Sequence, residues 1–259
     1  MAVAGIDAGS QSTKVVILEG DRILAAVTMQ TGESGESEAR QAMEEALRQA
    51  RLKMEDMKSV VSTGAGRMSV PFARKQRSIV SCLARGGHFL YPQARTVLDG
   101  GAESSTAIRL SADGTVVDSV GNDKCAAGAG AYLDTMSRTL GIPLAEFGAE
   151  SLMATSAETI SSTCAVFAES EVVSLVNRDP PVPIANILAG IHELMAGRLF
   201  GMVQRVGMQF EVVMSGGIGR NIGIIRAMEA KVGKRVLVPE DPRIVGALGA
   251  ALVARQGLA

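Results

Sequence analysis

The sequence has few aromatic residues and few cysteines, and each scarcity narrows what the protein can be. Aromatic residues make up 3% of the 259 residues and tryptophan is absent, so the core must rest on Ala, Val, Ile, Leu and Met. Three cysteines cannot form a disulfide framework, and they fall short of the four thiolates that an iron–sulfur cluster usually takes. A metal site built on them therefore needs another type of ligand or a second chain.

Charge excess, a basic leader and a long apolar run are also missing. A formal net charge of −1 gives no electrostatic reason to expect nucleic acid or an anionic membrane as a partner. The N-terminus carries Asp7 early and has no basic segment before an apolar run, so no signal peptide is expected. The longest uncharged apolar run, 244–254, is too short to span a bilayer. We therefore expect a cytoplasmic protein with no nucleic-acid and no membrane partner.

What the sequence does have is 29 glycines, clustered at turns that suit ligand-binding loops. Residues 2–7 and 13–18 are predicted to form a hairpin, with a third strand at 22–28. The segment 7–14 between them, Asp-Ala-Gly-Ser-Gln-Ser-Thr-Lys, puts a carboxylate beside backbone N–H groups, hydroxyls and a lysine. Such a loop can bind phosphate oxygens while the carboxylate holds Mg²⁺ through water, although its spacing is not that of a Walker A loop.

The same design recurs in the middle of the chain. A strand predicted at 94–99 ends at Asp99 before the segment Gly-Gly-Ala-Glu-Ser-Ser, and strands predicted at 106–110 and from residue 115 follow. Two such turns could face each other across a cleft and bind a polyphosphate with its metal from both sides. The repetition is much rarer by chance than either turn alone, so it favours a nucleotide site over two unrelated hairpin turns.

Two of the three cysteines share one local setting. Cys125 lies in a small-residue loop before an apolar-periodic run, and Cys164 lies in the first turn of a helix that Ser and Thr residues precede. Helix N-termini favour anionic sulfur, which suits thiolate chemistry or metal ligation. The ordinary alternative is a thiol packed as a small hydrophobic side chain. We prefer that alternative for Cys82, because the other members of a site near it and His88 are missing.

The remaining segments complete an alternating α/β pattern. Helices are expected over 35–52, around 79–85, over 184–205 and over 245–251, and strands at 59–63, 211–214 and 236–238. The strand at 211–214 runs into Ser-Gly-Gly-Ile-Gly-Arg-Asn at 215–221, followed by a helix. A strand–glycine–helix junction allows close approach of a ligand to the backbone and offers free N–H groups.

With its motifs in this order, the chain resembles the superfamily of actin, heat-shock ATPases and sugar kinases. The resemblance implies an α/β fold with two ribonuclease H-like domains around a nucleotide cleft, over residues 1–110 and 111–259. It implies phosphate loops at 7–14 and 99–105, an adenosine loop at 215–221, and a connecting helix at 246–251. The last helix can return to the N-terminal domain.

The cysteine loops at 122–130 and 162–170 resemble those of the ATP-dependent electron activators of 2-hydroxyacyl-CoA dehydratases and of the related ATPase subunits of benzoyl-CoA reductase. In that family one [4Fe-4S] cluster bridges two subunits, each of which gives two cysteines. Carried over, Cys125 and Cys164 are the metal ligands and Cys82 is a bystander. The resemblance also implies a homodimer, or a heterodimer with a related ATPase subunit, a ferredoxin or flavodoxin donor, and a dehydratase or reductase partner.

The expected activity is ATP hydrolysis with Mg²⁺, coupled to the delivery of low-potential electrons. The catalytic residues implied by the resemblance are Asp7, Asp99 and Glu103. The residues implied to bind ATP or ADP are Gly9, Ser10, Gln11, Ser12, Thr13, Lys14, Gly100, Gly101, Ala102, Gly216, Gly217, Gly219, Asn221, Pro239 and Gly246.

The second loop departs from the family pattern Asp-(Ile/Val)-Gly-Gly-Gln-Asp, because Glu103 stands where an amide is expected. This leaves open whether Glu103 orients the attacking water, acts as a base or binds Mg²⁺, and it makes the benzoyl-CoA reductase branch a candidate. Two other functions use the same ATP loops. One is a small-molecule (sugar) kinase with Asp99 as its base and idle thiols, and the other is a nucleotide-dependent regulator in which Cys125 and Cys164 sense redox state.

Overall fold

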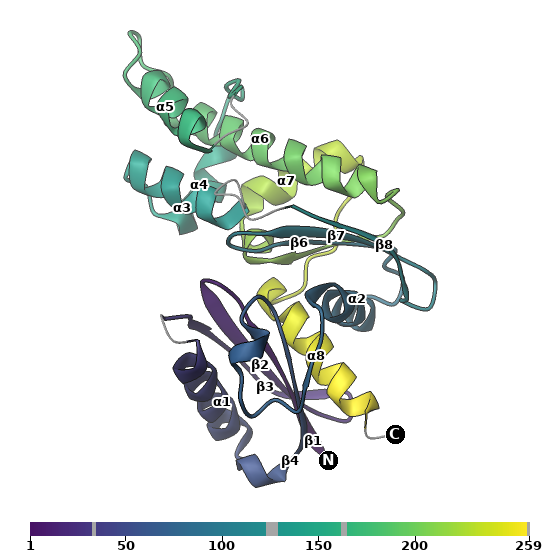
Figure 1. Cartoon of the computed structure of the whole chain (residues 1–259). Coiled ribbons are helices and arrows are strands. Elements are labelled where there is room, and N and C mark those ends of the chain that lie inside the picture. The colour runs from purple at the N-terminus through teal and green to yellow at the C-terminus, as the bar shows by residue number, and fades with distance from the viewer. Residues whose placement is uncertain (33–34, 123–128, 162–164, 258–259) are drawn as a thin grey trace.

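The computed structural model describes residues 1–32, 35–122, 129–161 and 165–257. These residues form two β-sheets, which occupy the lower and upper halves of Figure 1, with helices packed against both. No helix in the described part of the chain is long and apolar enough to cross a membrane.

The first sheet has the strand order β3-β2-β1-β4-β5. Its strands are β1 (Ala2–Ala8), β2 (Ser12–Glu19), β3 (Arg22–Gln30), β4 (Met57–Thr63) and β5 (Lys75–Gln76). The first three run antiparallel, whereas β4 pairs in parallel with β1 and β5 in parallel with β4. Helix α1 (Glu36–Ala50) covers one face with an apolar stripe, as its predicted amphipathic pattern requires. The expected hairpin, third strand and amphipathic helix are therefore confirmed.

The second sheet repeats this arrangement in the order β8-β7-β6-β9. Its strands are β6 (Thr96–Gly100), β7 (Ser105–Leu110), β8 (Val116–Gly121) and β9 (Val212–Gly216). Again three consecutive strands run antiparallel, and a later strand pairs in parallel with the first of them. In both sheets the strand that carries the loop aspartate is flanked by an antiparallel and a parallel neighbour. Residues 96–110, which the sequence analysis placed in the first domain, thus form strands of the second sheet.

The last helix, α8 (Val245–Gln256), returns to the first sheet and packs on the face opposite α1 (Figure 1). A Cβ added to Gly5 of β1 would overlap the carbonyl oxygen of Ala247, so the helix lies as close to the strand as glycine allows. Helix α2 (Ile79–Leu90) packs beside α8 and buries Cys82 completely. Burial raises the pKa of this thiol to about 11, so Cys82 is an uncharged core side chain at neutral pH.

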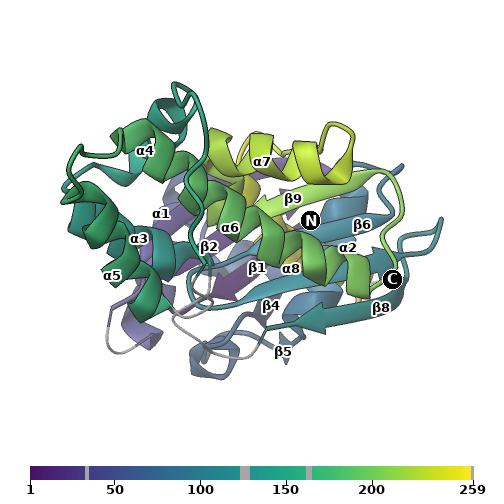
Figure 2. The same ribbon diagram turned by 90° about the horizontal axis from the view of Figure 1, so that it is seen from above.

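The other helices cover the second sheet (Figures 1 and 2). They are α3 (Ala129–Leu140), α4 (Leu144–Ser151), α5 (Ala165–Val176), α6 (Ile184–Arg205) and α7 (Ile222–Val232). Their apolar faces form one core with the sheet, built around large buried side chains such as Tyr132 and Phe147. Helix α6 has the predicted bounds, but α4 was not expected. The strand expected at 236–238 was wrong, because only Leu237 bridges to Val213 and the following proline has no N–H to extend the ladder.

Candidate functional site

The aspartate-bearing ends of β1 and β6 face one cavity of about 630 Å³ between the two sheets. The implied site residues that line it are Asp7, Gly9, Ser10, Gln11, Ser12, Lys14, Asp99, Gly101, Ala102, Glu103, Gly216, Gly217, Asn221 and Gly246. Four other residues of the expected set, Thr13, Gly100, Gly219 and Pro239, lie outside the lining. The three loops that were expected to bind nucleotide therefore line one cavity, although they are far apart in the sequence.

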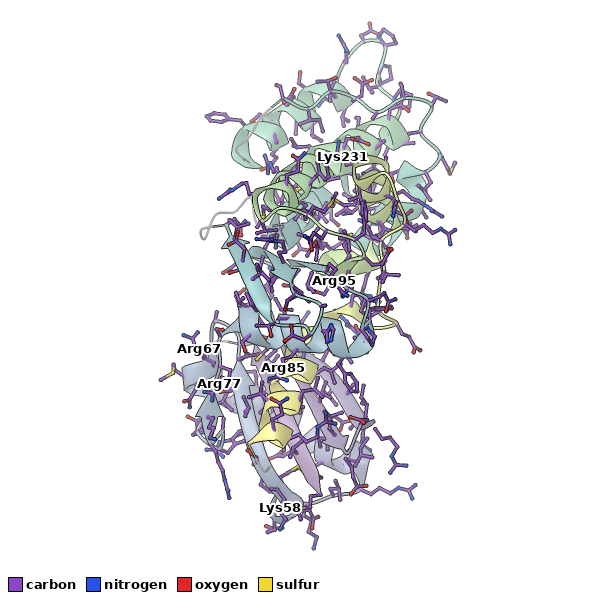
Figure 3. All side chains as sticks on the ribbon, turned by 90° about the vertical axis from the view of Figure 1, so that its right-hand side faces the viewer. Lys58, Arg67, Arg77, Arg85, Arg95 and Lys231 are labelled. Atoms are coloured by element: carbon purple, nitrogen blue, oxygen red, sulfur yellow. The ribbon has the colours of Figure 1, made fainter. Side chains whose placement is uncertain are left out.

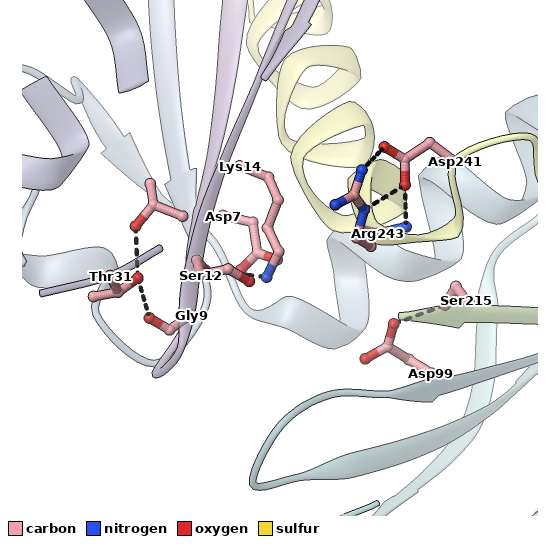
Figure 4. A network of polar contacts seen from close by, with 10 residues as sticks. Asp7, Gly9, Ser12, Lys14, Thr31, Asp99, Ser215, Asp241 and Arg243 are labelled. Carbon is pink, nitrogen blue, oxygen red and sulfur yellow. Dashed lines mark hydrogen bonds and ion pairs between the residues drawn. The ribbon is translucent and has the colours of Figure 1, made fainter. Parts of the chain in front are cut away.

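The first loop holds a carboxylate and a cation together. The Nζ atom of Lys14 lies 3.5 Å from Oδ2 of Asp7 and donates a hydrogen bond to the carbonyl oxygen of Ser12 at 3.1 Å (Figure 4). From behind, the hydroxyl of Thr31 donates to the carbonyl oxygen of Gly9 at 3.0 Å and contacts the hydroxyl of Thr13 at the same distance. Thr13 therefore supports the loop from the sheet side, which explains why it does not line the cavity.

The second loop places its aspartate in a different electrostatic setting. The hydroxyl of Ser215, on the neighbouring strand β9, donates a 2.8 Å hydrogen bond to Oδ1 of Asp99 (Figure 4). Burial raises the pKa of Asp99 to about 6, the Asp7 carboxylate adds to the rise, and the Ser215 hydrogen bond opposes it. A carboxylate with a pKa this close to neutral pH is suited to accept a proton during catalysis.

Two glycines with positive φ repeat the symmetry of the sheets. Gly64 follows β4 with a φ of 88°, and Gly216 ends β9 with a φ of 81°. A Cβ at Gly64 would meet the carbonyl oxygen of Ala8, and one at Gly216 would overlap that of Gly100. Each parallel strand thus leaves its sheet by a turn that only glycine fits, and the cavity floor beside each aspartate is bare backbone.

The remaining implied glycines shape the loops. A Cβ at Gly100 would overlap the side chain of Ile218, and one at Gly219 would stand 2.9 Å from Cβ of Pro242. Both residues therefore allow the adenosine loop to pack closely against its neighbours. Gly246 lies at the start of α8, where a Cβ would stand 3.3 Å from Oδ2 of Asp7.

Asn221 caps the helix that follows the adenosine loop. Its Oδ1 accepts hydrogen bonds from the N–H groups of Gly223 at 2.9 Å and Ile224 at 3.2 Å, as an N-cap residue does. Its amide nitrogen lies 3.1 Å from Nε2 of His192. Burial lowers the pKa of His192 to about 4, so the ring is neutral at pH 7 and Nε2 can accept this hydrogen bond.

Sequence reasoning missed a third wall of the cavity. The lining residues outside the expected loops are Gly64, Ala65, Ile79, Gly130, Leu133, Asp134, Leu144, Ala145, Gly148, Ala149, Ile222 and Arg243. The available signal was the spacing of Ala145, Gly148 and Ala149, which places three small residues on one face of α4. Arg243 is held by an ion pair of 2.8 Å with Asp241 (Figure 4), and its guanidinium adds positive charge to the wall.

Hydrogen bonds tie the second phosphate loop to both sides of the segment that contains Cys125. Before that segment, Asn122 exchanges two hydrogen bonds with Ser105, of 3.1 and 2.5 Å. After it, the N–H groups of Gly130 and Ala131 donate to the carbonyl oxygens of residues 101 and 102 at 3.1 and 2.8 Å. The start of α3 and the end of β8 are thus fastened to one loop of the cavity.

Cys125 and Cys164, the implied metal ligands, lie outside the described residues. Within the described part of the chain, no group of three or more His, Cys, Asp or Glu side chains is arranged to hold a metal ion. The cavity does hold the carboxylates of Asp7 and Asp99. This donor set fits Mg²⁺, which keeps several waters and binds through one or two carboxylates together with substrate phosphates.

Comparison with solved structures identifies the fold. An activator of the 2-hydroxyisocaproyl-CoA dehydratase from Clostridium difficile with bound ADPNP has a TM-score of 0.93 and 42% identity, covering 99% of this chain and 95% of that chain. A ROK family glucokinase from Streptomyces griseus matches with a TM-score of 0.61, covering 99% of this chain and 100% of that chain. At 14% identity this second likeness concerns the fold alone. The chain therefore has two ribonuclease H-like domains, as expected.

Sequence comparisons identify the family. The 2-hydroxyisocaproyl-CoA dehydratase activator of Clostridioides difficile is 42% identical over 255 residues, which are 98% of this chain and 95% of that protein. A benzoyl-CoA reductase subunit of Thauera aromatica is 36% identical over 261 residues, covering 96% of this chain and 91% of that protein. The model of the BadF/BadG/BcrA/BcrD ATPase family matches residues 4–254. The chain therefore belongs to the BadF/BadG/BcrA/BcrD ATPase family.

Proposed function

We propose that the chain is an ATPase that delivers low-potential electrons to an acyl-CoA dehydratase or reductase. The observation that carries this proposal is the set of hydrogen bonds between the second phosphate loop and the residues on either side of the Cys125 segment. A change in the loop on ATP hydrolysis would move both sides of that segment. Relatives that are named dehydratase activators and a benzoyl-CoA reductase subunit support the same function.

In this proposal the nucleotide binds in the cavity between the sheets. The loops around Ser10 and Gly101 bind the phosphates from opposite sides, and Lys14 adds a positive charge. Asp7 would hold Mg²⁺ through its waters, and this ion would neutralise charge on the phosphates. Asn221 and the start of α7 form the adenosine end of the site.

Hydrolysis then needs a group that takes a proton from the attacking water. We assign this role to Asp99, because it lines the cavity and burial raises its pKa to about 6, close to the working pH. Glu103 lines the same cavity with an exposed side chain. We assign it the role of orienting the attacking water, in place of the amide that the resemblance implies.

The electron carrier in this proposal is a [4Fe-4S] cluster shared by two subunits. Cys125 and Cys164 of each subunit would hold it, which requires a homodimer or a heterodimer with a related subunit. The cluster would supply a one-electron carrier at low potential. A ferredoxin or flavodoxin is the proposed donor, and the cytoplasm is the proposed location.

The sugar-kinase alternative has weaker support. Its relatives share the fold at 14% identity, whereas the activator shares 42% identity over nearly the whole chain. Phosphorylation of a sugar panel by the purified chain would favour the kinase over the activator.

Iron content is the direct test of the proposed function. After anaerobic purification, the wild-type dimer should contain about four irons and absorb in the iron–sulfur region. Cys125→Ser and Cys164→Ser should each lose the iron and weaken the dimer. Cys82→Ser is the matched control, since Cys82 is a fully buried thiol against α8, and it should keep the iron. Equal iron in all three variants would contradict the assignment.

A further inference from the structure

Residues 57–98 contain no acidic residue, although the whole chain has 27 Asp and Glu against 26 Lys and Arg. The stretch contributes seven basic residues, which we call the basic face: Lys58, Arg67, Arg74, Lys75, Arg77, Arg85 and Arg95. It forms β4, β5, α2 and the start of β6. A chain that is nearly neutral overall therefore carries an excess of positive charge in this one stretch.

The side chains of the basic face are exposed or half-buried, and their charges reach the surface. Figure 3 labels five of the seven, which are spread along the molecule from Lys58 at the lower end to Arg95 at the second sheet. None of the seven forms an ion pair with a carboxylate in the described part of the chain. Basic residues elsewhere do, as in the 2.9 Å pair of Arg40 with Glu36. The seven charges are therefore free of short-range pairing within the described residues.

The centre of the basic face is the edge of the first sheet. The backbone N–H of Arg77 donates a hydrogen bond to the carbonyl oxygen of Ser62 at 2.9 Å. The hydroxyl of Ser62 donates to the carbonyl oxygen of Arg67, also at 2.9 Å. Charges on a short edge strand protect it from pairing with another sheet. That purpose extends to Lys58, because β5 pairs with β4 only at residues 61 and 62, but it cannot account for Arg85 on α2.

The basic face also bridges the two halves of the molecule. Lys58 lies on a strand of the first sheet, and Arg95 directly precedes β6 of the second. A partner seated across it would contact both halves, whose strand ends line the nucleotide cavity. Figure 2 shows β5 on the same side of the molecule as β8, which ends four residues before Cys125.

We propose that the basic face docks an acidic surface of the dehydratase or reductase that receives the electron, an inference that rests on the proposed function. Uncompensated charge steers a partner of opposite charge and fixes its orientation. A single-stranded nucleic acid fits the face less well. The aromatic residues of the stretch, Phe72, Phe89 and Tyr91, are all partly buried, so they present no exposed ring on which a base could stack.

The experiment measures binding to the 2-hydroxyisocaproyl-CoA dehydratase of Clostridioides difficile, with a non-hydrolysable ATP analogue present. The test variant combines Arg74→Glu, Lys75→Glu and Arg77→Glu. The control variant combines Arg22→Glu, Arg40→Glu and Arg48→Glu, which make the same change in net charge outside the basic face. We expect the test variant to bind at least ~10-fold more weakly than wild type at low salt, and the control within about threefold. Raising the salt from about 50 to about 300 mM should weaken wild-type binding and leave the test variant nearly unchanged.

Several outcomes would overturn the proposal. These are equal affinity of the test and control variants, wild-type binding that salt does not weaken, no wild-type binding at all, or binding of a single-stranded oligonucleotide through the same three residues. Unchanged melting temperature and nucleotide affinity show that the test variant is folded. Iron content and ATP hydrolysis of the wild type are measured on the same preparation. If the wild type contains no iron and does not hydrolyse ATP but still binds the dehydratase in a salt-sensitive way, the proposed function is refuted and the docking surface is retained.

Discussion

Removing the hydroxyl of Ser215 tests whether Asp99 is the group that limits ATP hydrolysis at low pH. In the wild type this hydroxyl donates a 2.8 Å hydrogen bond to Asp99 and so favours its ionised form. The pKa of Asp99 is nevertheless raised to about 6, chiefly by burial. Because the base must be ionised, we expect the kcat/KM of the wild type to fall as the pH drops through about 6.

The size of the shift in Ser215→Ala follows from the strength of the lost hydrogen bond. A hydrogen bond to a charged group contributes roughly 1.5–3 kcal/mol, and one pKa unit corresponds to about 1.4 kcal/mol. Loss of the bond removes stabilisation of the charged form, so the pKa of Asp99 rises by about 1–2 units. The acid limb should therefore move to about pH 7–8, and at pH 7 hydrolysis should fall about twofold to tenfold.

The assay is phosphate release by each protein between about pH 5 and pH 9, with kcat/KM taken because it reports the free enzyme. Ser62→Ala is the control, since Ser62 and Ser215 are both fully buried serines on parallel strands that pair with a loop-bearing strand. Titration of the nucleotide is common to all proteins and cancels in the comparison. An acid limb at the same pH in Ser215→Ala and Ser62→Ala would refute the assignment of Asp99.

Two further predictions concern stability, both measured by urea unfolding. Gly216→Ala should lower the free energy of unfolding by about 2–4 kcal/mol, because φ at Gly216 is 81° and the new Cβ would overlap the Gly100 carbonyl. Gly217→Ala is the control, since a Cβ there meets open space, and its free energy of unfolding should stay close to that of the wild type. Similar losses in both variants would contradict this. His192 is neutral in the fold with a pKa of about 4 but protonates near pH 6.5 when unfolded, so its contribution to stability is complete above pH 6.5 and declines as the pH falls toward 4. The wild type should lose about 2–3 kcal/mol more than His192→Gln between pH 7.5 and 4.5, and parallel losses would show that His192 is not buried neutral.

The fold and the floor of the cavity could be predicted from the sequence, because both depend on local patterns. Two strands around a turn with aspartate and glycine specify a hairpin whatever the rest of the chain does. The recurrence of this pattern at Asp99 predicted a second hairpin of the same kind. Gly216 was predictable for the same reason, since a strand that enters a tight turn needs a residue that tolerates positive φ. The prolines at 180, 181 and 183 also indicated where α6 begins.

The third wall of the cavity was not predictable in this way. Helix α4 contributes Ala145, Gly148 and Ala149, which carry no polar group and no motif, and they line the site only because the core of the second half places them there. The sheet to which β6 belongs was also hidden. Strand pairing between β6 and β9 joins residues more than a hundred positions apart, and only the tertiary fold settles such a contact.

The repeated architecture yields two aspartates with unlike surroundings. Asp7 and Asp99 occupy the same place in their sheets, each opposite a hydroxyl residue of the parallel neighbour, Thr63 and Ser215. Asp7 lies 3.5 Å from the ammonium group of Lys14, whereas Asp99 accepts its hydrogen bond from the neutral Ser215. Burial raises the pKa of Asp99 to about 6, which suits it to take a proton, and Asp7 beside Lys14 is left as the candidate metal ligand. The same backbone arrangement therefore occurs twice, and the different side chains around it suit Asp7 to metal binding and Asp99 to accepting a proton.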